Sequence, residues 1–113
     1  MSEERLPTAL WVEAHLHRLT AEGRAYYILH KGEYASGMVL VKINALDGTC
    51  VLLQQQRDFM TDMLGWVPAL NKEIVEESEA DAYIRRAVDR DPDLWVVEVE
   101  DRDMKNPFEE DLV

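Results

Sequence analysis

A row of carboxylates near the C-terminal end of the chain is the feature with the clearest potential for chemistry. Glu98, Glu100 and Asp101 stand close together, and Asp103 follows them. Mg²⁺ and Ca²⁺ take several oxygen ligands, often from carboxylates. If the segment is a strand, Glu98 and Glu100 share one face because side chains alternate. We therefore consider Glu98, Glu100 and Asp101 a candidate divalent-metal site. The alternative is that they are solvated carboxylates at a strand end.

A second group of candidate residues is apolar. Met60, Met63, Leu64 and Trp66 fall in a segment whose secondary structure the pattern leaves open. If these side chains are exposed together, they form a patch suited to a protein partner or to a second copy of the chain. The alternative for Trp66 is a place in the core, where an aromatic side chain buries a large area.

Lys42 and Glu98 are candidates for a charge pair. Each interrupts an otherwise apolar run of residues. If the two runs are neighbouring strands, one pair across the sheet accounts for both charges. The alternative, which we favour, is that each charge lies beyond the edge of a covering helix, in water.

The other reactive side chains lack the spacing that catalysis or metal binding requires. His15 and His17 are two residues apart, so on a helix they point roughly 200° away from each other. A single cysteine, Cys50, excludes an internal disulfide, and no motif supplies it with a histidine base. No glycine-rich phosphate loop and no Gly-x-Ser-x-Gly motif occurs. The sequence thus predicts no catalytic residue and no cofactor, apart from the possible metal.

Composition restricts the class of partner. The chain has 113 residues, a formal net charge of −11 and a pI of about 4.6. Binding to nucleic acid or to an anionic membrane surface requires clustered Lys and Arg, which this sequence does not show. No apolar run approaches the ~20 residues that span a bilayer, and the N-terminus does not resemble a signal peptide. We expect a cytoplasmic, single-domain protein over residues 1–113.

The elements that would position these residues are read from hydrophobic periodicity. A stripe at three- and four-residue spacing predicts a first helix, and a capping-box-like Ser78–Asp81 opens a second that ends at Asp91-Pro92. Asp47-Gly48 predicts a hairpin turn. In order, we expect a helix at 8–22 and strands at 25–31, 38–44 and 49–55. The stretch at 57–65 is ambiguous, although its residues at 59–64 fit a short helical turn. A possible strand at 66–70, a helix at 78–90 and a strand at 94–99 follow.

This order predicts an α+β fold, with two main helices on one mainly antiparallel sheet of four to five strands. The strand from Leu94 to Val99 is apolar on both sides at its start, which indicates a central position, and the preceding helix could place it parallel to a neighbour. The acidic tail at 101–113 is expected to be loosely ordered, although Phe108 could attach it.

Three segments resemble a bacterial family known only as a domain of unknown function. They are Arg5–Ala14, the stretch from Gly37 to Gly48, and Asp91–Arg102, which reads Asp-Pro-Asp-Leu-Trp-Val-Val-Glu-Val-Glu-Asp-Arg and is the most specific. The resemblance implies a small, stand-alone cytoplasmic protein and supplies no activity, ligand or catalytic residue.

Two functions from different classes remain. The first, which we favour, is a non-enzymatic protein-interaction domain that uses the apolar segment around Met60. The second is a small metal-dependent enzyme or ligand-binding protein that uses the carboxylates after Val97. Convergence of Glu98, Glu100 and Asp101 on one cleft would favour the second function, and separate positions would favour the first.

Overall fold

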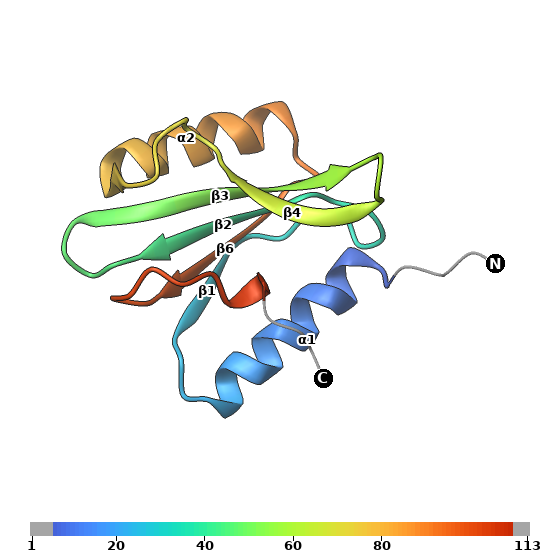
Figure 1. The fold of residues 1–113 in the computed structure, drawn as a ribbon, viewed down its shortest axis with the longest axis horizontal. Coiled ribbons are helices and arrows are strands. Elements are labelled where there is room, and N and C mark those ends of the chain that lie inside the picture. The colour runs from blue at the N-terminus through green and yellow to red at the C-terminus, as the bar shows by residue number, and fades with distance from the viewer. Residues whose placement is uncertain (1–5, 110–113) are drawn as a thin grey trace.

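The computed structural model describes residues 6–109, which form two helices on opposite faces of one sheet (Figure 1). The helix α1 lies on one face, and α2 lies on the other (Figure 1). In chain order the elements are α1 (Thr8–Ala21), β1 (Tyr26–His30), β2 (Val39–Asn44), β3 (Thr49–Asp58), β4 (Met63–Pro68), β5 (Val75–Glu76), α2 (Glu77–Arg90), β6 (Trp95–Glu100) and the 3₁₀ turn η1 (Pro107–Glu109).

The sheet has six strands in the order β1-β6-β2-β3-β4, and the short β5 pairs with β3 beyond the end of β4. β6 runs parallel to β2, whereas all other pairs are antiparallel. The predicted α+β class is confirmed, as is the central, parallel position of the strand after Leu94. The sheet is mixed rather than simply antiparallel, because the chain crosses back through α2 before it adds β6 beside β2.

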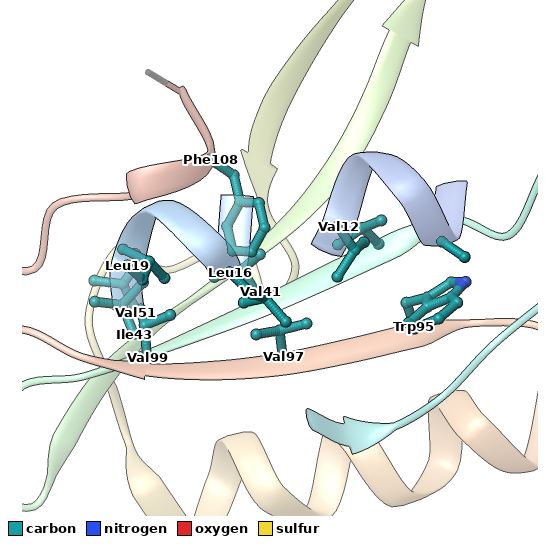
Figure 2. Close-up of a cluster of buried hydrophobic side chains, with 12 residues drawn as sticks. Val12, Leu16, Leu19, Val41, Ile43, Val51, Trp95, Val97, Val99 and Phe108 are labelled. Carbon is teal, nitrogen blue, oxygen red and sulfur yellow. The ribbon is translucent and has the colours of Figure 1, made fainter. Parts of the chain in front are cut away.

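The first core lies between α1 and the sheet (Figure 2). Val41 and Val97 are paired neighbours on β2 and β6, and their side chains face Leu16 on α1 (Figure 2). Burying such a side chain fully contributes roughly 1.5–3 kcal/mol. The buried members of this core are Ala9, Val12, Leu16, Leu19, Val39, Val41, Ile43, Val51, Trp95, Val97, Val99 and Phe108.

The second core lies between α2 and the opposite face. The buried face of α2 consists of Ala80, Ile84 and Ala87. They pack with the alternate residues of the strands, namely Leu40, Cys50, Leu52, Val75, Leu94 and Val96. Since both of its faces are covered, every residue of β2 is buried.

The loop before β2 contacts the start of β6 closely. Glu33 N donates a hydrogen bond to the Asp93 carbonyl oxygen (2.9 Å), and the Trp95 indole N–H donates to the Glu33 carbonyl oxygen (2.8 Å). A Cβ at Gly32 or Gly37 would collide with the Asp93 carbonyl and the Trp95 ring. The two glycines are therefore required by this close approach of backbone to backbone.

The segment after Gln55 differs most from prediction. The expected helical turn at 59–64 is wrong, because β3 continues to Asp58 and β4 begins at Met63. The Asp58 carboxylate accepts hydrogen bonds from the amides of Met60 (2.8 Å) and Thr61 (3.4 Å), and Asp62 has a φ of 60°. Side-chain-to-backbone bonds of this kind favour a tight turn over a helix. The result is a long β3–β4 hairpin.

The start of α2 also differs from prediction. No side chain caps α2, so the capping box at Ser78–Asp81 does not form. Asp81 instead faces the sheet, where it contacts Lys42. The helix α1 begins at Thr8, as predicted.

The C-terminal segment returns to α1. Phe108 is buried in the first core, and Arg18 Nη2 donates to the Pro107 carbonyl oxygen at 2.6 Å. Loose order of the segment at 101–113 stays a prediction, and its last residues, 110–113, lie outside the described part of the chain. Within residues 6–109, neither helix is long and apolar enough to cross a membrane.

Candidate functional site

The β3–β4 hairpin carries the most exposed apolar side chains of the described chain. Phe59 is 91% exposed and Met60 is 85% exposed at the turn, and Met63 is 67% exposed where β4 begins. Leu64 and Val67 follow along the strand, at 44% and 36%. The tip of the hairpin, at the right of Figure 1, extends past the end of α2. We call these five residues the hairpin surface.

Of the four apolar residues predicted from the sequence, Met60 and Met63 are exposed at the end of the hairpin, and Leu64 is exposed on the α1 side of β4. Trp66 also points toward α1, but it is only partly exposed. It stacks on Trp11 with ring centroids 6.4 Å apart and lies 6.2 Å from the ring of Phe108. Sequence reasoning omitted Phe59, although its place next to Asp58, a turn former, was a signal for exposure.

β4 forms one edge of the sheet, and Pro68 at its last residue is the one feature of the strand that discourages pairing with another chain. Its six residues contain no charged side chain, and they pair with β3 without a register shift, from Met63 opposite Asp58 to Pro68 opposite Leu53. The other edge strand, β1, is irregular, because its register with β6 shifts between Ile28 and His30. Charges and bulges are the usual means by which proteins prevent edge strands from pairing with other chains.

The hairpin also has a hollow beside Gly65. A Cβ at this position would meet only the Gln56 carbonyl oxygen, at 3.9 Å. Phe59, Met60 and Val67 line the hollow, which has a volume of about 450 Å³. Gln56, Arg57 and Asp58 also line it, so the hollow offers both apolar and polar contacts to another molecule.

A cluster of charges lies between α2 and the face of the sheet that α2 covers. The Lys42 ammonium is 2% exposed and lies 2.8 Å from a carboxylate oxygen of Glu77, 2.8 Å from one of Asp81 and 3.6 Å from one of Glu98. Asn44 Nδ2 donates to Glu98 (2.9 Å) and to Glu77 (3.3 Å). The favoured prediction, that Lys42 and Glu98 each lie in water, is wrong, and the alternative of a charge pair between them is confirmed.

This cluster keeps Lys42 charged. Burial disfavours the ammonium, but hydrogen bonds from Lys42 to Asp81 and Glu77 and the charge of Glu98 outweigh it, so the pKa of Lys42 is raised. A lysine that stays protonated is neither a nucleophile nor a general base at neutral pH. Sequence reasoning missed Glu77 and Asp81 as partners, since no local pattern joins a strand residue to a helix 35 to 39 residues later.

The three carboxylates proposed as metal ligands have separate partners. Glu98 faces Lys42, Glu100 accepts a hydrogen bond from the Tyr27 hydroxyl (3.4 Å), and Asp101 accepts one from Arg24 (3.1 Å). Among residues 6–109, no three His, Cys, Asp or Glu side chains are grouped so that they could hold a metal ion. Metal binding at these carboxylates stays a prediction that this arrangement does not favour.

Two further titratable groups are buried. His15 is 1% exposed, and burial together with the charge of Arg18 lowers its pKa to about 4. Burial raises the pKa of the Cys50 thiol to about 11, so this cysteine is protonated at neutral pH. Both side chains therefore contribute to packing in their neutral forms.

Comparison with known proteins gives relatives in one family. A family model described as "Protein of unknown function (DUF1491)" matches residues 6–109. A crystal structure of a DUF1491 family protein from Caulobacter crescentus is 34% identical, with a TM-score of 0.79, over 92% of this chain and 94% of that one.

Two solution structures are also similar. The NMR structure of a DUF1491 family protein from the same organism is 33% identical (TM-score 0.76, 93% and 94% of the two chains). That of a protein from A. tumefaciens is 28% identical (TM-score 0.68, 87% of each chain). No curated protein matches the chain.

Proposed function

Because the chain belongs to the DUF1491 family, whose function is unknown, we propose a function from its geometry: a non-enzymatic protein-interaction domain that binds through the hairpin surface. The family match confirms the resemblance that the sequence indicated, but the family supplies no known activity. The proposal therefore depends on the exposed side chains and on the state of the buried charges.

The exposure of Phe59 and Met60 is the observation that carries this proposal. A side chain 91% or 85% exposed makes almost no contact within its own chain. Single exposed apolar residues are ordinary, but here Met63 and Val67 continue the exposed apolar surface along the α2 side of an uncharged strand. Leu64 is exposed on the α1 side of the same strand. Phe and Met are enriched at the centres of protein interfaces, where burial of their large apolar area stabilises the complex.

The buried polar groups favour binding over catalysis. Lys42 is held by carboxylates and stays protonated, and Cys50 stays a thiol, so neither supplies a nucleophile at neutral pH. His15 is buried between Trp11 and Phe108 and faces the core rather than a cleft. Each of these three buried side chains therefore has a structural role in the fold.

Site-specific photo-crosslinking in living cells tests the proposal. A benzophenone amino acid in place of Phe59 should form a covalent adduct of defined mass on irradiation, because a bound partner would cover this position. The matched control replaces Tyr34, an aromatic residue that is 56% exposed in the loop between β1 and β2. It should give no such adduct.

Two results would contradict the proposal. One is the absence of any discrete adduct from position 59, and the other is the same adducts from Phe59 and Tyr34. Mass spectrometry of the excised band identifies the captured chain. A second label in place of Met63, in the same hairpin, should capture the same chain as the label at Phe59.

A further inference from the structure

We infer that the hairpin surface binds a second copy of this chain, and that the two β4 strands pair antiparallel across a twofold axis. The two sheets then become one continuous sheet. This inference rests on the proposed function, because it uses the same surface and names its partner.

The edge of β4 is suited to backbone pairing. On its inner side the strand pairs with β3 through six consecutive residues, and no described strand covers its outer side. An edge strand exposes a row of N–H and C=O groups that can pair with another strand of the same regularity. A regular strand is available on a second copy, and closed twofold dimers are the commonest oligomers.

The side chains of β4 are complementary to themselves in this arrangement. Side chains alternate, so Met63, Gly65 and Val67 point to the α2 side, while Leu64 and Trp66 point to the α1 side. A twofold axis at Gly65 places Met63 of each copy opposite Val67 of the other, and both are exposed apolar residues in the monomer. Gly65 of each copy lies opposite Gly65 of the other at the axis, so no side chains clash above or below the sheet there.

The charges flanking β4 favour a second copy over a basic partner. Although the chain carries a net charge of −11, residues 53–72 are neutral, because Arg57 and Lys72 balance Asp58 and Asp62. Arg57 lies with the two acids at the hairpin end, 3.2 Å from Asp62, and Lys72 lies past the Pro68 end, 3.1 Å from Glu79. The flanks of β4 therefore carry no net charge that would repel a second copy or attract a basic partner.

Sedimentation equilibrium of the purified full chain, from micromolar to millimolar concentration, measures this association. The wild-type protein should shift with concentration from 13.1 kDa toward twice that mass. Leu64→Lys, which places a charge on the β4 edge, should weaken the dimer by roughly tenfold or more. The matched control is Ile28→Lys on the β1 edge, where the exposure is 46% against 44% at Leu64.

The comparison is sharp because both substitutions change the net charge equally. Each makes the chain less negative, so weaker repulsion alone would strengthen association in both variants. Circular-dichroism melts establish that each variant is folded.

A wild-type chain that stays monomeric up to millimolar concentration overturns the inference. A dimer that Leu64→Lys leaves intact, or that Ile28→Lys disrupts equally, also overturns it. If Phe59 captures a different protein while the chain stays monomeric, the proposed function stands and this inference fails.

Discussion

His15 is a buried side chain that links the stability of the protein to pH. Its ring lies 4.6 Å from that of Trp11 and 5.0 Å from that of Phe108, centroid to centroid. Arg18 Nη2 lies 3.0 Å from His15 Nδ1, and because a guanidinium can only donate, Nδ1 accepts and the ring proton is on Nε2. The neutral imidazole therefore suits this site, and a protonated one does not.

Stability should fall as the pH is lowered from about 6.5 to about 4. The pKa of His15 is lowered to about 4 in the folded protein, so in this window only the unfolded chain binds the proton. One pKa unit corresponds to about 1.4 kcal/mol, so the loss reaches at most about 3.5 kcal/mol and levels off below pH 4. Urea unfolding at a series of pH values measures it.

The matched variants are His15→Gln and, on the exposed side of α1, His17→Gln. The first should flatten the dependence between pH 6.5 and pH 4, and the second should retain it. An unchanged slope in His15→Gln would show that other groups cause the acid sensitivity.

Lys42 should matter for stability rather than for activity. Lys42→Met removes the cation that three carboxylates share and leaves Glu98, which is 13% exposed, beside Glu77 and Asp81. Loss of one member of a buried ion cluster costs several kcal/mol, and partial exposure of the acids reduces this, so we expect a loss of about 2–3 kcal/mol in urea unfolding at pH 7.

The pH dependence provides a second test of Lys42. The pKa of Lys42 is raised in the folded state. Its contribution to the free energy of unfolding is therefore complete below the pKa of the unfolded state, about 10.4, and is lost as the pH rises through the pKa of the folded state. The difference in stability between wild type and Lys42→Met should thus be constant from pH 7 to about pH 10. A loss below about 0.5 kcal/mol at pH 7 would mean that the cluster contributes nothing net.

The residue scale also shows where pattern reasoning was wrong. The apolar strands around Lys42 and Glu98 predicted either a pair or two solvated charges, and the favoured alternative was solvation. The structure shows the pair because α2 extends over this part of β2, and Glu77 and Asp81 on its first turns reach Lys42. The position of a helix above a sheet depends on long-range packing, which one strand's sequence does not contain.

The 3₁₀ turn η1 is the element that attaches the C-terminal segment to α1. Phe108→Ala should lower stability by about 3 kcal/mol, because a buried aromatic side chain is removed and a cavity remains. Chemical unfolding measures the loss. The matched control is Phe59→Ala, which removes the same side chain from a position that is 91% exposed and should change stability by less than about 0.5 kcal/mol.

This pair of variants also tests the predicted loose order of the tail. If the segment at 101–113 is loosely ordered in solution, Phe108→Ala should cost no more than Phe59→Ala. A large difference between them would mean that at least Phe108 is held in the core.

The elements themselves could largely be predicted. The stripe of α1, the Asp47-Gly48 turn and the Asp91-Pro92 helix end are local signals, and each element they define is present at the expected place. The β3–β4 hairpin was the exception. Phe59, Met60, Met63 and Leu64 fit a helical spacing by chance, and the Asp58 turn bonds decided against the helix.

At the scale of the whole molecule, one sheet separates two cores. Residues at alternate positions of β2 and β6 enter the α1 core or the α2 core, which is why both strands are apolar on both faces. The layers leave the sheet edges uncovered, and the strand order places β4 at one of them. The apolar hairpin surface is therefore a consequence of topology, and its exposure supports the proposed interaction.

The sequence by itself determined the α+β class, most helix and strand positions, the central place of the last strand and the family. These follow from local periodicity, turn residues and motif identity, which involve residues near one another in the chain. Only the tertiary structure decided which side chains meet. Lys42 and Glu98 became partners because β2 and β6 are adjacent in register, and Glu98, Glu100 and Asp101 were given separate partners. Trp66 packs against the α1 core, whereas Met60 is exposed to solvent. Strand order and helix packing, rather than composition, determine which side chains are exposed.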